Sequence, residues 1–278
     1  MKVINIQLTS VPNVDQNLTA IESYLVSCGT DINGSVVVLP ECCVYFGGRD
    51  NHNLKLAEQL GEGPIQSALK GLAKRFSCYL VAGSVPTKTT AQNKYANTCF
   101  VYSPSGELLC HYQKIHLFDV DVSDNTKSYR ESDTTEAGDE IITFDTPWGR
   151  VGVAICYDLR FPALFQALRD KGAELIVLPS AFTQKTGEAH WKILLQARAI
   201  ENQVYIAGCN QTGRHENGRE TYGHSMVIDP WGEVLVDAEQ DLGVSMAELD
   251  RNRLSSIRSQ MPVKAHNRFA SKLEKDFK

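Results

Sequence analysis

The chain has 278 residues, of which 42% are hydrophobic, so it is long enough to bury a sizeable core as one large domain or two small ones. Its formal net charge of −5 argues against nucleic acid or an anionic membrane as the main partner. No apolar run is long enough to span a membrane and the N-terminus does not resemble a signal peptide, so we expect a cytoplasmic protein.

Eight cysteines are scattered along the chain, and in the cytoplasm we expect them to be reduced. The chain contains no C-x-x-C pair and no H-E-x-x-H motif, and its seven histidines do not cluster. The sequence therefore offers no candidate metal site, and we expect neither a metal nor a cofactor.

Strands and helices alternate in the first third of the chain. Apolar runs predict strands at 2–8, 35–39 and 79–85, and helical spacing of apolar residues predicts helices at 15–28 and 53–76, the second broken at 61–64. This alternation favours an α/β layered fold over an all-β fold.

Three turn motifs then predict antiparallel strand pairs. Ser-Pro-Ser-Gly joins the strands expected at 95–102 and 108–113, and Thr-Pro-Trp-Gly and Asp-Pro-Trp-Gly occur at 146–149 and 229–232. Proline followed by glycine with one residue between them suits a tight turn between antiparallel strands. We therefore expect three hairpins.

The remaining segments continue the alternating pattern. The polar stretch 121–140 predicts an ordered surface loop. Apolar runs predict strands at 151–155, 174–178 and 204–209, and helical spacing predicts helices at 163–171 and 186–201. The basic, weakly amphipathic segment 254–278 is expected to be a tail that packs on the body or on a partner subunit.

The run 151–155 stops at Cys156, and the polar pair and proline beyond it predict a sharp elbow before a helix. Backbone N–H groups and the helix dipole at such a place would stabilise a thiolate, so Cys156 is the candidate nucleophile. The alternative is that Cys156 is a small core hydrophobe, which is the commoner fate of cysteine.

Two more reactive groups follow predicted strands, Glu41 after 35–39 and Lys114 after 108–113. In open α/β sheets such strand ends meet at one crevice, so we expect a carboxylate, an ammonium and a thiol to converge. Taken singly, each has another interpretation, a surface cap for Glu41 and a solvated side chain for Lys114.

Three segments resemble the signature motifs of the nitrilase superfamily of carbon–nitrogen hydrolases: LPECCVYFGG at 39–48, YQKIHLFDVDV at 112–122 and GVAICYDLRFP at 152–162. Later segments, PSAFTQKTGEAHW, ARAIENQVY and YGHSMVIDPWG, are similar to the Nit branch and extend the resemblance over nearly the whole chain. The resemblance implies a four-layer α-β-β-α sandwich in a single domain, 1–278, with 254–278 as its C-terminal tail. It also implies a homodimer or a larger homo-oligomer.

The same resemblance implies a catalytic set. It carries a Glu-Lys-Cys triad over to Glu41, Lys114 and Cys156, and an additional glutamate over to Glu131. Glu41 would act as general base, Lys114 and the backbone N–H of Tyr157 would stabilise the oxyanion, and Glu131 would hold Lys114.

The implied reaction is hydrolysis of a small carboxylate-bearing amide to an acid and ammonia through a cysteine thioester, with deaminated glutathione as the expected substrate. The alternatives are an omega-amidase acting on 2-oxoglutaramate or 2-oxosuccinamate, a true nitrilase, and a scaffold that keeps the sandwich without catalysis. A serine hydrolase is poorly supported, because the sequence has no G-x-S-x-G elbow.

Four side chains are expected to bind the substrate. Arg160 follows Cys156 by four residues and its planar guanidinium suits a carboxylate, although a structural salt bridge is an equal alternative. Phe182 and Thr186 match positions that line the substrate site in the resembling branch, and Tyr45 follows Glu41 closely.

Overall fold

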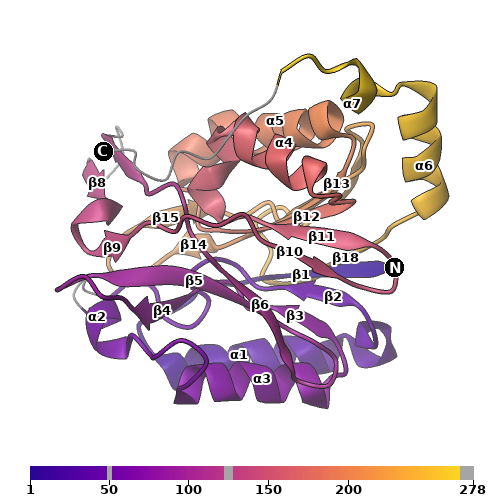
Figure 1. Ribbon diagram of the computed structural model, residues 1–278. Coiled ribbons are helices and arrows are strands. Elements are labelled where there is room, and N and C mark those ends of the chain that lie inside the picture. The colour runs from indigo at the N-terminus through magenta and orange to yellow at the C-terminus, as the bar shows by residue number, and fades with distance from the viewer. Residues whose placement is uncertain (49–51, 122–127, 270–278) are drawn as a thin grey trace.

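Two mixed β-sheets lie face to face, and helices cover the outer face of each (Figure 1). The computed structural model describes residues 1–48, 52–121 and 128–269. In Figure 1, α1 (Val14–Ser27) and α3 (Pro64–Arg75) lie below one sheet, and α4 (Pro162–Asp170) and α5 (Gln184–Asn202) lie above the other. The layers therefore follow the order α-β-β-α, and the fold predicted from the resemblance is confirmed.

The first sheet contains strands from near both ends of the chain. Its order is β18 (Gly243–Glu248), β1 (Lys2–Gln7), β2 (Val36–Val38), β3 (Tyr79–Val81), β5 (Tyr95–Tyr102) and β4 (Val85–Lys88), with β6 (Leu108–Gln113) and β9 (Thr135–Glu136) also paired to β5. Strands β1, β2 and β3 are parallel, and β18 is antiparallel to β1. Because β18 completes the sheet that β1 begins, this pairing supports our proposal of a single domain.

The second sheet has the order β10 (Thr143–Asp145), β11 (Arg150–Val153), β12 (Leu175–Ser180), β13 (Tyr205–Asn210), β16 (Met226–Ile228) and β17 (Val234–Asp237). Strands β11, β12 and β13 are parallel. The three turn motifs join the antiparallel pairs β5 and β6, β10 and β11, and β16 and β17. The three predicted hairpins are therefore confirmed.

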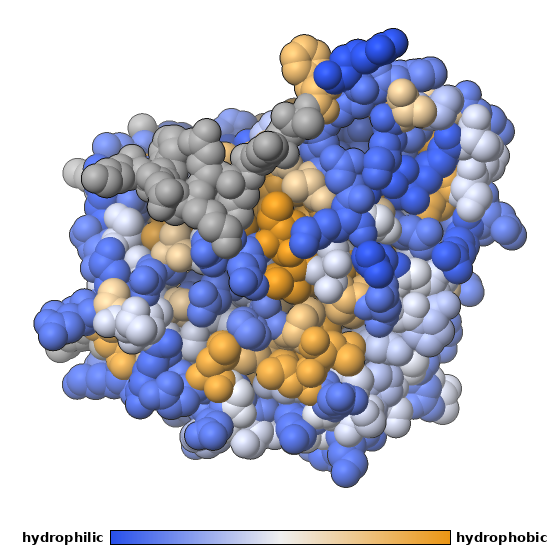
Figure 2. Space-filling view, in the orientation of Figure 1, coloured by the Kyte–Doolittle hydropathy of each residue, from blue (hydrophilic) through white to orange (hydrophobic). Residues whose placement is uncertain are grey.

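Strand β1 shows how the sequence fills both sides of its sheet. Val3 packs in the cluster that includes Val151 of the second sheet, whereas Ile4 and Ile6 pack in the cluster that includes Ile21 of α1. Successive side chains of a strand point to opposite faces, so one apolar run can serve two cores. The outer surface differs: Figure 2 shows a largely hydrophilic face with apolar residues gathered across its middle.

Several segments differ from the sequence predictions. The strand predicted at 79–85 is two strands, β3 and β4, because the chain turns at Gly83, where φ is +54°. The loop predicted at 121–140 contains β8 (Ser128–Arg130), which pairs with β7 (Asp119–Asp121), and the 3-10 helix η2 (Glu131–Asp133). Its residues 122–127 lie outside the described part of the chain.

Other elements were not predicted or have different bounds. A hairpin of β14 (Thr212–Arg214) and β15 (Glu220–Tyr222) was missed, because its sequence has no apolar alternation. The predicted helix at 53–76 is α2 (His52–Leu56) and α3, and 3-10 helix η1 (Gly29–Ile32) follows α1.

The segment proposed as a tail begins inside a helix. Helix α6 (Arg251–Gln260) buries Leu254 and Ile257 against the body, and α7 (Val263–His266) follows it. Residues 270–278 of the proposed tail lie outside the described residues.

Candidate active site

Glu41 lies just beyond the carboxyl end of β2, at a bend of the backbone. It is 5% exposed, and its Oε1 accepts hydrogen bonds from Nδ2 of Asn97 at 2.9 Å and from Nζ of Lys114 at 2.8 Å. Gly83 packs directly against this bend, where a Cβ on residue 83 would clash with the carbonyl oxygen of Pro40. The backbone thus places the Glu41 carboxylate in a buried position, where it is paired with the Lys114 ammonium.

Lys114 follows β6 and is held by both its backbone and its side chain. Its N–H donates to the carbonyl of Asn97 at 3.0 Å, and its own carbonyl accepts from Gly138 at 2.8 Å. Its Nζ donates to Glu41, and to Oε2 and Oε1 of Glu131 at 2.8 and 3.1 Å. Burial works to lower the pKa of Lys114, but the Glu131 and Glu41 carboxylates outweigh it and hold the pKa well above its usual value. The ammonium therefore stays charged at neutral pH.

Glu131 is the first residue of η2 and bonds the Lys114 ammonium through both carboxylate oxygens. Its Oε2 also accepts the backbone N–H of Phe118 at 2.7 Å. Burial raises the pKa of Glu131, the Lys114 ammonium opposes that rise, and the Glu41 carboxylate adds to it. One buried and one half-buried carboxylate thus share one ammonium, which makes this centre unfavourable for a further anion.

Cys156 occupies the elbow between β11 and the 3-10 helix η3 (Cys156–Arg160), with φ at +46°. It is 7% exposed, and the Glu41 carboxylate, the Lys114 ammonium and the N–H of Ala181 lie close enough to its thiol to shift the pKa of that group. Burial raises the pKa of the thiol well above its usual value and Glu41 raises it further, against the Lys114 ammonium and the Ala181 N–H. Burial and Glu41 therefore outweigh any stabilisation of a thiolate that the elbow provides. Because η3 is short and a carboxylate lies near the sulfur, the thiol keeps its proton until a base removes it.

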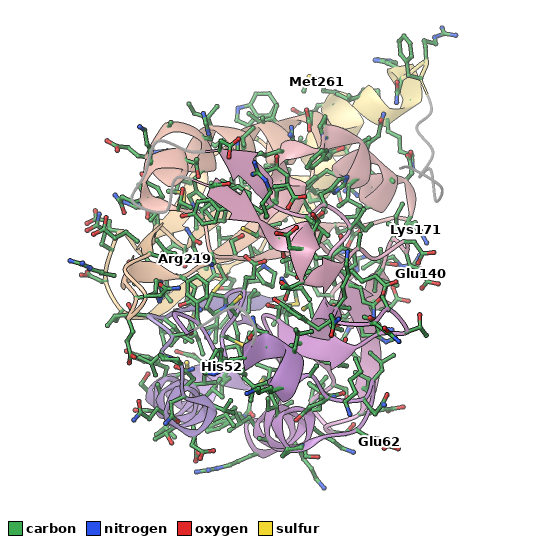
Figure 3. All side chains as sticks on the ribbon, turned by 90° about the vertical axis from the view of Figure 1, so that its left-hand side faces the viewer. His52, Glu62, Glu140, Lys171, Arg219 and Met261 are labelled. Carbon is green, nitrogen blue, oxygen red and sulfur yellow. The ribbon has the colours of Figure 1, made fainter. Side chains whose placement is uncertain are left out.

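The four side chains open onto one cavity of about 370 Å³. The cavity lining also includes four residues predicted to contact substrate: Tyr45, Tyr157, Phe182 and Thr186. Figure 3 views the molecule from the left-hand side of Figure 1. Arg219, another lining residue, is labelled there. The structure thus brings together, in one cavity, residues that lie far apart in the sequence.

Comparison with known proteins identifies this combination of sandwich and site. The family model for carbon-nitrogen hydrolases matches residues 3–259. This chain belongs to the carbon–nitrogen hydrolase family. The family expected from the three motifs is therefore confirmed.

Relatives of this carbon–nitrogen hydrolase match it over nearly their whole length. It is 42% identical over 269 residues to a deaminated glutathione amidase from Yersinia enterocolitica, covering 96% of this chain and 93% of the relative. It is 38% identical over 264 residues to omega-amidase NIT2 from Homo sapiens, covering 95% of this chain and 92% of the relative. Among solved structures, Nit3 from Saccharomyces cerevisiae, a member of branch 10 of the nitrilase superfamily, is similar with a TM-score of 0.86 at 32% identity, covering 97% of both chains.

A buried carboxylate that sequence reasoning missed holds the elbow of this hydrolase. Asp158 is fully buried, and its Oδ2 accepts the hydroxyl of Tyr112 at 2.7 Å and the N–H of Ile155 at 2.8 Å. Its Oδ1 accepts the backbone N–H of His116 at 3.1 Å and lies 2.6 Å from Nδ1 of that histidine. A carboxylate three residues into a short helix, bonded back to the N-cap N–H, is half of a capping box, but the N-cap here is Ile155 and not Ser or Thr, so the sequence lacks the usual signature.

This network ties two catalytic segments together. Tyr112 and His116 stand two residues on either side of Lys114, and Asp158 stands two residues after Cys156. The position of the ammonium and that of the thiol are therefore fixed by the same carboxylate.

Arg160, which the sequence predicted to bind substrate, is not among the lining residues of the cavity but lies against two of them. Its guanidinium lies over the rings of Tyr157 and Phe182, 5.8 and 5.3 Å from their centroids, and one of its nitrogens is 3.2 Å from Nδ1 of His190. A 3-10 helix has three residues per turn, so a step of four residues leaves the side chain rotated by about 120°. Arg160 is therefore displaced around the helix from Cys156 and packs on two rings of the cavity wall.

The described ranges show no group of three or more His, Cys, Asp or Glu residues that could hold a metal ion. Within the same ranges, none of the helices has the length and apolar character needed to cross a membrane. All eight cysteines are free thiols, as predicted.

Proposed function

We propose that this chain is an amidase that hydrolyses a small carboxylate-bearing amide through a thioester on Cys156, and that deaminated glutathione is its substrate. One observation carries the proposal: the Cys156 thiol and the Glu41 carboxylate line one cavity, and that carboxylate is bonded to the Lys114 ammonium at 2.8 Å. The similarity to named amidases over most of the chain supports it.

Glu41 is the proposed general base. The pKa of Cys156 is raised, so the thiol needs a partner to take its proton as the sulfur attacks the amide carbon. The Glu41 carboxylate is near enough to raise the pKa of that thiol, and the transferred proton leaves Glu41 as a neutral acid beside Lys114. The carbonyl oxygen becomes an oxyanion in the same step.

Lys114 and the backbone N–H of Tyr157 are the proposed oxyanion donors. The N–H of Tyr157 lies in the first turn of η3, where helix N–H groups have no acceptor within the helix, and Tyr157 lines the cavity. Preorganised donors of this kind are each worth on the order of 3 kcal/mol. Glu131 is proposed to keep Lys114 aimed at the oxygen, since it bonds the ammonium through both carboxylate oxygens.

The acyl-enzyme forms when Glu41 returns its proton to the leaving nitrogen and the C–N bond breaks. Water, deprotonated by the same carboxylate, then attacks the thioester carbon and releases the acid and the free thiol. The leaving group depends on the substrate. A primary amide releases ammonia, as the sequence led us to expect, whereas the amide nitrogen of deaminated glutathione belongs to a cysteinylglycine unit, which leaves as the dipeptide.

An omega-amidase is the second candidate, because the chain is also 38% identical to omega-amidase NIT2 from Homo sapiens. The triad chemistry would be the same, so the site geometry does not separate the two. A scaffold without catalysis is less favoured, because burying Glu41, Lys114 and Glu131 together has a desolvation cost that packing alone does not require.

The test is steady-state kinetics on a small panel: deaminated glutathione, 2-oxoglutaramate, 2-oxosuccinamate and a simple nitrile. The assay must follow both ammonia and the released amine. We expect the highest kcat/KM with deaminated glutathione. Higher kcat/KM with 2-oxoglutaramate would replace this proposal with the omega-amidase, and no turnover of any member would support the scaffold.

Two further expectations remain proposals. We propose a homodimer or larger homo-oligomer, which light scattering on the purified chain would test. We propose a cytoplasmic location, which fractionation of the source cell would test.

A further inference from the structure

Asn97 is a buried amide that the proposed mechanism does not use. It belongs to β5, is 7% exposed, and lines the same cavity as Glu41 and Cys156. The next residues at alternate positions of β5, Cys99 and Val101, pack in the apolar cluster between the two sheets. An amide on that face of the strand costs free energy unless it is hydrogen-bonded. Its bonding partner therefore indicates what the amide does.

The amide of Asn97 and the ammonium of Lys114 donate to the same oxygen of the Glu41 carboxylate. Nδ2 of Asn97 lies 2.9 Å from Oε1 of Glu41, and Nζ of Lys114 lies 2.8 Å from that oxygen. An ionised carboxylate offers about two acceptor sites on each oxygen, so two donors occupy those of Oε1. Oε2 is then the oxygen that can take a proton without displacing a donor.

This division of the carboxylate matters because the proposed mechanism uses Glu41 twice. Glu41 takes the proton of the Cys156 thiol and later gives it to the leaving nitrogen, so the proton must stay where the substrate can reach it. A carboxyl group can carry its proton on either oxygen. With the N–H of Asn97 on Oε1, moving the proton to that oxygen would break a hydrogen bond. The proton is thereby kept on Oε2.

The backbone of Asn97 is held on both sides within the first sheet. Asn97 lies opposite Pro86 of β4, and its carbonyl accepts the N–H of Lys114 at 3.0 Å. Side chains on rigid strands are positioned more precisely than those on loops. The bond to Lys114 is made by the backbone, so a change of side chain at position 97 leaves it in place. The role of the amide can therefore be tested without moving the ammonium.

We propose that Asn97 is a positioning residue that occupies Oε1 of Glu41, so that the catalytic proton travels through Oε2. The proton passes from Sγ of Cys156 to Oε2 as the C–S bond forms. It passes from Oε2 to the leaving nitrogen as the C–N bond breaks, and the electron pair of that bond goes to the nitrogen. Asn97 neither gains nor loses a proton.

This inference rests on the proposed amidase function and adds to it the path of the proton. It applies to any amide, because it concerns the base and not the binding of the substrate. Without the amide, the protonated Glu41 can hold its proton on the oxygen beside Lys114. Thiol deprotonation is then still available, but return of the proton to the leaving nitrogen is impaired.

The experiment compares Asn97→Leu, which removes the donor at similar volume, with the wild-type enzyme. The first measurement is kcat and KM on the amide that the wild-type enzyme turns over fastest. The second is the rate constant for alkylation of Cys156 by iodoacetamide, followed by mass spectrometry. We expect kcat to fall about tenfold or more with KM little changed, because general acid catalysis is weakened. Alkylation should keep its wild-type rate constant, because it needs a thiolate but no protonated leaving group.

Three further variants support this comparison. Asn53→Leu removes another amide of the cavity wall, one that donates to the Tyr95 hydroxyl at 3.1 Å, and should leave the ratio of kcat to the alkylation rate constant unchanged. Cys156→Ala gives the background alkylation of the other cysteines. Urea unfolding reports whether Asn97→Leu is folded. Asn97→Ala, which puts no bulk against the carboxylate, tests the same ratio if it is not.

The outcomes separate this inference from the proposed function. A wild-type kcat in the variants at position 97 overturns the role of Asn97 and leaves the amidase standing. An equal fall in kcat and in the alkylation rate constant also overturns it, because a general disturbance of the site would slow both. No turnover of any amide by the wild-type enzyme defeats the proposed function and this inference with it.

Discussion

Asp158→Asn tests whether one buried carboxylate positions the nucleophile. Asp158 accepts from the Tyr112 hydroxyl, the Ile155 N–H and the His116 N–H, and lies 2.6 Å from the His116 Nδ1. Because an ionised carboxylate only accepts, that ring nitrogen must carry the hydrogen. Asparagine keeps one accepting oxygen and replaces the other with an NH₂ group, which is itself a donor.

The size of the effect follows from this count. Asparagine at 158 leaves two of the four donors without an acceptor, and each unsatisfied buried donor costs about 1–3 kcal/mol. We therefore expect Asp158→Asn to lose about 2–6 kcal/mol of unfolding free energy, out of a total that is typically about 5–15 kcal/mol. The elbow residue Cys156 has a φ of +46°, a conformation that non-glycine residues adopt at a cost, so the loss of its support should also lower kcat.

Urea unfolding and steady-state kinetics measure the two parts. Tyr112→Phe removes one donor and leaves the carboxylate in place, so it should cost less than Asp158→Asn and serves as the variant that keeps the fold. For both variants we expect kcat to fall more than KM rises, because the thiol and the ammonium are misplaced while the cavity wall remains. A urea midpoint and a kcat equal to wild type in Asp158→Asn would refute the positioning role.

Further predictions concern single groups. Cys156→Ala should abolish turnover with an unchanged urea midpoint, and substantial remaining activity would exclude Cys156 as nucleophile. Glu131→Gln should lower kcat and move the alkaline limit of activity to lower pH, because the Glu131 carboxylate helps to raise the pKa of Lys114; an unmoved limit would argue against this coupling. Burial lowers the pKa of His215 although the Ser10 carbonyl opposes this, so the unfolded chain binds the proton first and stability should fall as the pH drops below about 6.5. His215→Gln should flatten that dependence in urea unfolding between pH 7.5 and 5, and an identical slope in both proteins would contradict it.

Strand periodicity predicted the frame of the site well. Glu41 and Cys156 each follow a short run of buried residues, and a run of that kind can end only at the edge of a sheet. The hairpin turns were equally predictable, because proline fixes its own φ and glycine adopts the positive φ that tight turns need. These features depend on residues close together in the chain, so the sequence displays them directly.

Local sequence patterns did not predict which residues contact the charged groups. Asn97 lies inside β5 and looks like any strand residue, yet its amide donates to Glu41 from 56 positions away. Arg160 was predicted to bind substrate on its proximity to Cys156 alone, and the sequence did not indicate that its guanidinium lies over the rings of Tyr157 and Phe182. Arg219, 63 positions beyond Cys156 in a segment without apolar periodicity, gave no local signal. Glu131 was predicted only through the family resemblance.

The distribution of these groups explains why the centre depends on the closed sandwich. Glu41, Lys114 and Glu131 all come from the first half of the chain and form a buried ionic group around one ammonium. The thiol comes from the second sheet, and the nearby Glu41 carboxylate raises its pKa. An isolated second sheet would therefore present a thiol without a base, and an isolated first sheet would expose an ion cluster to water, which weakens each ionic interaction. The hydrogen bonds from Tyr112 and His116 to Asp158 join the first half of the chain to the second. They therefore help to hold the base, Glu41, and the nucleophile, Cys156, in one site.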